Sequence, residues 1–119
     1  MLNLIVIRSN DTEHLAEFYS ALGLSFERHK HLNGPEHFSA TVGNIVFEIY
    51  PANKESDKTT GTRLGFNVLS LEKTLARLEN LRAKIIRKPE ETDYGRRAVV
   101  EDFEGHKVEI YQNESRIRN

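Results

Sequence analysis

The sequence predicts an α+β fold made of two tandem β-α-β-β-β modules. The first observation is a repeat, because residues 44–50 and residues 106–111 both end in an apolar residue followed by Glu-Ile-Tyr. The second is that each run follows a glycine turn, which is typical of the second strand of a hairpin. The third is that each run lies downstream of an amphipathic helix with a capping residue, Asp11 or Ser70, at a nearly equal separation. A duplicated unit accounts for all three.

The first module begins with an apolar run over residues 2–7, which predicts a buried strand. Asp11 then caps a helix whose apolar side chains recur on one face and are Leu15, Phe18, Tyr19 and Leu22. Gly23 closes this helix as a left-handed residue. A second strand starts over residues 24–28. Alternating or apolar patterns then predict a hairpin, with strands over residues 37–42 and 45–50.

The second module repeats this order after a polar linker over residues 51–62. A strand over residues 63–69 precedes a helix capped by Ser70. The side chains on the core-facing side of this helix are Leu71, Leu75, Leu78 and Leu81 or Arg82. We expect a strand at 83–87, a loop over Pro89–Gly95, and a last hairpin with strands at 98–101 and 107–111. The chain is thus read as one domain over 1–119, with module one at 1–50, module two at 63–112 and a frayed polar tail at 113–119.

Composition excludes several functions. The 119 residues carry a net charge of −1, so no basic excess points to nucleic acid. The chain has no cysteine, which removes thiol catalysis and cysteine-ligated metal and fits a cytoplasmic protein. No apolar run is long enough for a membrane span, and the apolar N-terminus lacks the features of a signal peptide.

Glu48 and Glu109 are the first candidates for function. A carboxylate inside an apolar strand costs several kcal/mol unless it faces water, a partner or a ligand, and here that cost occurs in both copies. The pair could contact a ligand. Alternatively, each glutamate could form a structural ion pair with Arg63 or Arg97 that neutralises its charge. The two interpretations are compatible.

The sequence resembles the vicinal-oxygen-chelate superfamily, which includes glyoxalase I, bleomycin-resistance proteins and extradiol dioxygenases. The motifs behind the resemblance run through residues 11–19 with Leu22-Gly-Leu24, then Phe47-Glu-Ile-Tyr50, and finally residues 97–110. Together they cover nearly the whole chain. The resemblance implies that the modules form mixed sheets around an open cleft, that Glu48 and Glu109 face that cleft, and that the protein is a homodimer.

The resemblance also implies two further metal-ligand positions, on the first strand of each module. In this chain they fall on Leu4 and on Arg63, or on Leu64 if the register slips by one. Leucine has no ligating atom, and arginine is a cation with donors only. Glu48 and Glu109 alone could hold Mg²⁺ or Mn²⁺ loosely. Without a metal, a Glu48–Arg63–Glu109 cluster would be held by charge-assisted hydrogen bonds. Arg63 could therefore form a structural salt bridge or bind an anionic ligand in the pocket.

Four more side chains are candidates for contact with a ligand. His37 begins a strand that should line the cleft, where it could act as a general base or hydrogen-bond donor, or could simply support the hairpin. Arg97, or its neighbour Arg96, could hold a carboxylate or phosphate. Tyr50 and Tyr111 each follow a glutamate by two residues, so they share its face of the strand, as cleft aromatics or as rim packing.

The leading expectation is therefore a protein that binds a small organic molecule without a tightly bound metal, as in the antibiotic-resistance branch of the superfamily. One alternative is a glyoxalase-like lyase or isomerase, with a weakly held divalent metal and Glu48 or Glu109 as a general base whose pKa is raised by burial. A second alternative is a structural or partner-binding module with a filled cleft. The sequence does not identify the ligand.

Overall fold

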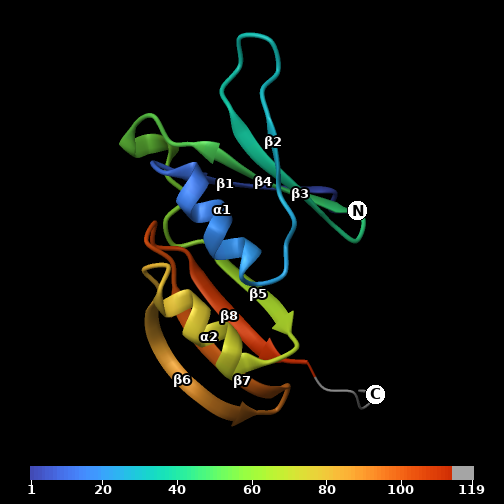
Figure 1. Ribbon diagram of the computed structural model, residues 1–119, viewed down its shortest axis with the longest axis vertical. Helices are drawn as coiled ribbons and strands as arrows, with labels where there is room; N and C mark the ends of the chain where they lie inside the picture. The colour runs from blue at the N-terminus through green and yellow to red at the C-terminus, as the bar shows by residue number, and fades with distance from the viewer. Residues whose placement is uncertain (114–119) are drawn as a thin grey trace. The chain divides into compact units, whose positions relative to one another are not determined.

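The computed structural model describes residues 1–113 of the chain, and the polar tail at 114–119 lies outside these described residues. The chain folds as two compact units that divide after Thr60. Figure 1 labels the elements of both units. Each unit consists of one helix and one four-stranded sheet, so the expected α+β fold with two β-α-β-β-β modules is confirmed.

The first unit has its strands in the order β1-β4-β3-β2. Strand β1 runs parallel to β4, and the other neighbours are antiparallel, which makes the sheet mixed. The element bounds are β1 (Leu4–Ser9), α1 (Thr12–Ser20), β2 (Glu27–His29), β3 (His37–Val42) and β4 (Ile45–Pro51), followed by the short 3-10 helix η1 (Glu55–Asp57).

Helix α1 begins as expected, because the Asp11 carboxylate accepts a hydrogen bond from the His14 backbone N–H at 3.2 Å. Its apolar stripe is buried against one face of the sheet. Tyr19 lies at the centre of this core, with its ring centroid 5.0 Å from that of Phe18 and 5.4 Å from that of Phe47. The helix therefore covers one face of the sheet and leaves the other face for a site.

The second unit repeats this arrangement with the strand order β5-β8-β7-β6. Strand β5 runs parallel to β8, and the other pairs are antiparallel. Ser70 caps the helix by accepting from the Lys73 backbone N–H at 3.3 Å. The element bounds are β5 (Arg63–Val68), α2 (Leu71–Glu79), β6 (Lys84–Thr92), β7 (Gly95–Glu101) and β8 (Lys107–Gln112).

The expected loop over Pro89–Gly95 is wrong, because β6 continues to Thr92. Proline lacks a backbone N–H and is tolerated only on edge strands or at bulges. Strand β6 is an edge strand, and its register against β7 shifts between Arg87 and Glu90, where Pro89 lies. The sequence shows the proline but not the bulge that accommodates it.

Two further boundaries differ from expectation. Strand β2 begins at Glu27 rather than near Leu24, and the preceding Phe26 packs its ring against Phe47 at 6.2 Å. Helix α2 ends at Glu79, so the stripe does not extend to Arg82, which adopts a left-handed φ of 65°. Within residues 1–113, no helix is long and apolar enough to cross a membrane.

Candidate functional site

The candidate site is on the face of the second sheet that α2 does not cover. Side chains alternate along a strand, so Leu64, Phe66 and Val68 turn to one face of β5 and their neighbours to the other. The pairing of Arg63 with Lys107 and of Gly65 with Glu109 settles the strand register. The register places nine residues of β5, β8 and β7 on one face, here called the open face. They are Arg63, Gly65 and Asn67 of β5, Lys107, Glu109 and Tyr111 of β8, and Arg97, Val99 and Glu101 of β7.

Three donors surround the carboxylate of Glu109. Arg63 donates from Nε to Glu109 Oε2 at 2.5 Å. The Tyr111 hydroxyl donates to Oε1 at 2.7 Å, and Arg97 approaches the same oxygen through Nη1 at 3.4 Å. The Glu109 side chain is 19% exposed, so these donors replace most of the water that the carboxylate would otherwise bind. The expected contacts of Glu109 with Arg63 and Arg97 are present.

These contacts set the protonation states of the cluster. The hydrogen bond from Tyr111, followed by that from Arg63, lowers the pKa of Glu109 against the opposing effect of burial. Donating to Glu109 raises the pKa of Tyr111, and a hydrogen bond with Tyr111 is the main cause that raises the pKa of Arg97. The expectation of a raised pKa at Glu109 is therefore wrong, because hydrogen bonding outweighs burial.

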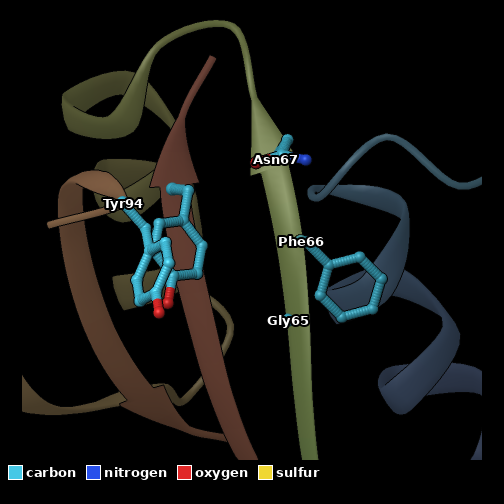
Figure 2. A pocket seen from close by; sticks show the side chains of 5 residues that line it. Gly65, Phe66, Asn67 and Tyr94 are labelled. Carbon is cyan, nitrogen blue, oxygen red and sulfur yellow. The ribbon is translucent and has the colours of Figure 1, made fainter. Parts of the chain in front are cut away.

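A hollow of about 420 Å³ opens next to this cluster. It is lined by Gly65, Phe66, Asn67, Tyr94 and Tyr111. Figure 2 shows the ring of Tyr94 on one side of β5 and the ring of Phe66 on the other. Phe66 thus contributes its backbone to the lining, and the side chains around the hollow are aromatic rings and one amide.

At Gly65, beside Glu109, no side chain covers the backbone of β5. A Cβ built at this position would have no atom within 4 Å, so the space above the backbone is empty of protein. The absence of a side chain here also leaves the backbone accessible to a ligand. Sequence reasoning missed Gly65, and a glycine inside a strand pattern was the signal that could have found it.

Tyr94 is a second residue that sequence reasoning missed. It lies at the turn between β6 and β7, where its backbone N–H donates to Thr92 Oγ1 at 3.1 Å. The same hydroxyl donates to the Gly95 carbonyl at 2.7 Å, and Gly95 has a φ of 113° that favours glycine. This turn holds a largely exposed aromatic side chain at the hollow.

The corresponding face of the first unit has a different arrangement. Glu48 is paired in register with Val6, as Glu109 is with Gly65, which places Leu4 at the position of Arg63. The ion contact of Glu48 is with His37, at 3.6 Å from Oε2 to Nε2. Because leucine cannot donate, this strand position of the first unit offers Glu48 no counterpart of the Arg63 hydrogen bond.

His37 is 2% exposed and is held from several sides. Its Nδ1 lies 3.2 Å from the Pro35 carbonyl, and its Nε2 lies 3.3 Å from the Tyr50 hydroxyl. The rings of His37 and Tyr50 stack at a centroid distance of 4.1 Å. The Pro35 carbonyl can only accept, so Nδ1 is the donor in that contact, and Nε2 faces both the Tyr50 hydroxyl and the Glu48 carboxylate.

Of the expected Glu48–Arg63–Glu109 cluster, the contact between Arg63 and Glu109 is present within the second unit. A joint contact with Glu48, which belongs to the first unit, stays a prediction. Arg96 does not share the site, because it pairs with Glu72 at the start of α2 at 2.5 Å. This contact lowers the pKa of Glu72.

The sequence model of the glyoxalase/bleomycin resistance protein/dioxygenase superfamily matches residues 1–110. The chain belongs to this superfamily. The match spans both units, in agreement with the duplicated sheet and helix pattern. No curated protein matches the chain.

Solved structures of the superfamily share the fold at low sequence identity. A glyoxalase/bleomycin resistance protein/dioxygenase family enzyme from Burkholderia phytofirmans is 20% identical, with a TM-score of 0.70 over 91% of this chain and 94% of that one. TnmS3, an antibiotic binding protein from a Streptomyces species, is 17% identical, with a TM-score of 0.68 over 96% of each chain. Hypothetical protein SA1046 from S. aureus is 15% identical, with a TM-score of 0.72 over 95% and 96%.

The residues at the metal positions that the resemblance implies do not fit a tightly bound divalent metal. Leu4 offers no ligand atom, and Arg63 places a cation 2.5 Å from an oxygen of Glu109. A divalent ion on Glu109 would either have to displace this guanidinium from the carboxylate or bind against its electrostatic repulsion. Among residues 1–113, no group of three or more histidine, aspartate and glutamate side chains is arranged to hold a metal.

Proposed function

We propose that this superfamily member binds a small organic molecule in the hollow on the open face of its second sheet, without a tightly bound metal. The observation that carries this proposal is the hollow of about 420 Å³ beside a carboxylate whose hydrogen bonds come from the protein itself. Binding sites for small molecules are concave and combine apolar or aromatic walls with a few polar groups. Tyr94, Tyr111 and Asn67 supply such a lining.

The fold is shared with the antibiotic binding protein TnmS3, so it is suited to binding, but it is shared equally with the Burkholderia phytofirmans enzyme and does not by itself decide between binding and turnover. The low pKa of Glu109 weakens the lyase alternative, because a carboxylate held firmly in its ionised form is a poor proton acceptor. We further propose that the protein is a homodimer, from the resemblance alone, and that it is cytoplasmic, from its lack of cysteine. Light scattering on the purified protein would measure the oligomeric state.

The test is a thermal-shift screen of the whole protein against small aromatic compounds, with and without Mn²⁺. A ligand that binds only the folded state raises the unfolding temperature. We expect stabilising compounds that need no metal. Gly65→Leu should fill the hollow and remove the shifts, whereas Thr41→Leu, a leucine on an exposed position of β3, should keep them.

Two outcomes would replace this proposal. Shifts that appear only with Mn²⁺, together with turnover of the compound, would favour the glyoxalase-like lyase. A complete lack of shifts in the wild type would favour the structural or partner-binding module. Shifts that survive Gly65→Leu would show that binding occurs elsewhere on the molecule.

A further inference from the structure

Arg63 has an unusual position for a cation in this superfamily, since it stands where the resemblance implies a metal ligand. Its contact with Glu109 uses only Nε. Among the described residues of the second unit, 61–113, its Nη1 and Nη2 nitrogens have no hydrogen-bond or ion-pair partner, and the side chain is 55% exposed. A guanidinium carries five N–H donors in a planar fork, so most of its hydrogen-bonding capacity remains available.

Of the two arginines that contact Glu109, Arg63 has fewer carboxylate partners. Two guanidinium groups, of Arg63 and Arg97, share the single carboxylate of Glu109. Arg97 has a second carboxylate partner, Glu90 of β6, at 3.6 Å. The two guanidinium groups are thus balanced by two carboxylates, and Arg63 is the one with a single carboxylate partner, which it shares with Arg97.

Arg63 is also aligned with the hollow. Arg63, Gly65 and Asn67 follow one another on the same face of β5, at a spacing of about 7 Å between same-face neighbours. Gly65 and Asn67 line the hollow. A ligand above Gly65 would thus have a guanidinium at one end and an amide at the other, with the rings of Tyr94 and Tyr111 beside it.

We propose that Arg63 takes the place of a metal as the fixed cation of the site and binds the carboxylate of a planar aromatic acid lying over Gly65. The carboxylate would accept hydrogen bonds from the unpaired Nη nitrogens, while the aromatic body packs against Tyr94 and Tyr111. This inference rests on the proposed function and adds the chemical class of the ligand.

Isothermal titration calorimetry of the whole protein with 2-naphthoate and its neutral analogue 2-naphthamide tests the inference. The two probes share a ring system and differ in the charge of one group. We expect 2-naphthoate to bind at least about tenfold more tightly, since a hydrogen bond to a charged group is worth more than a neutral one.

Substitutions then assign the preference to Arg63. In Arg63→Gln, 2-naphthoate should bind no more tightly than 2-naphthamide, and Arg63→Lys should retain part of the difference because it keeps the charge but loses the planar fork. Arg96→Gln is the matched control, because Arg96 pairs with Glu72 instead of the open face. It should keep the full preference.

Three results would overturn the inference. They are an equal affinity for both probes in the wild type, a preference that persists in Arg63→Gln, and no binding of either probe. Each is distinguishable from a failure of the proposed function, because neutral compounds that stabilise the wild type but not Gly65→Leu would still establish the hollow as a binding site. Folding of each variant is checked by its thermal unfolding.

Discussion

Glu48 and Glu109 occupy corresponding places in the two copies of the repeat, yet their surroundings differ. Glu109 accepts from Tyr111 and Arg63 and also contacts Arg97. Glu48 has an ion contact with His37 at 3.6 Å, and the histidine in turn is hydrogen-bonded to Tyr50. The difference follows from two strand positions, which hold Arg63 and Arg97 in one copy and Leu4 and His37 in the other.

This difference predicts unequal effects of neutralising the two glutamates. Glu109→Gln should lower the free energy of unfolding by about 1–3 kcal/mol, because it leaves Arg63 and Arg97 without their shared acceptor. Glu48→Gln should change it by less than about 1 kcal/mol, because it removes one long contact with a histidine. Urea unfolding of both variants at pH 7 measures the difference. Equal losses would contradict the account.

The pH dependence of stability should carry the signature of Glu109. Its pKa in the folded protein lies below the ordinary value of 4.5, so the unfolded state binds the proton more readily. The stabilisation is therefore present above about pH 4.5 and is lost as the pH falls through the lower pKa of the folded state. Urea unfolding between pH 7 and pH 3 should show a steeper loss for the wild type than for Glu109→Gln. Parallel curves would show that Glu109 is not held in its ionised form.

At the scale of elements, the turn between β7 and β8 depends on a buried, hydrogen-bonded pair of side chains. Asp102 and His106 have fully buried side chains, with Nδ1 of His106 2.8 Å from Oδ2 of Asp102. The same aspartate accepts the backbone N–H groups of Glu104 and His106 at 2.9 and 3.0 Å. This pair fixes the start of β8 and thereby the position of Glu109 two residues farther along the strand.

Removing one partner of this pair should be costly. His106→Ala should destabilise the protein by about 1–3 kcal/mol, because it removes the ring nitrogen that is hydrogen-bonded to the buried Asp102 side chain. His14→Ala is the matched control, because His14 contacts Asp11 at 2.5 Å on the surface, where such a pair is worth at most about 1 kcal/mol. The measurement is the unfolding temperature of each variant relative to that of the wild type. A similar small loss in both variants would mean that the buried pair is not needed for the turn.

The elements also explain what sequence could and could not predict. The Glu-Ile-Tyr repeat and the caps Asp11 and Ser70 are local signals, and they led to the correct module order and helix starts. The extension of β6 past Pro89 depends on a bulge against β7, which is a tertiary feature. Tyr94 was missed as a site residue for a similar reason, because its place beside β5 depends on how the hairpin folds back.

At the scale of the whole molecule, membership of the superfamily establishes the fold and leaves the activity open. The solved structures are 20% identical or less, and they range from an enzyme to an antibiotic binding protein. The residues at the metal positions therefore decide between the functions. Sequence identified Arg63 and Glu109 as partners, and the structure adds their geometry and the hollow beside them.

The metal content of the protein is the most direct test of this account. The protein is incubated with Mn²⁺, Ni²⁺ and Zn²⁺, dialysed exhaustively and examined by elemental analysis. We expect no retained metal, because Arg63 occupies the carboxylate that a metal would need. Near-stoichiometric metal in the wild type that disappears in Glu109→Gln would contradict the account and make the lyase the function to assay.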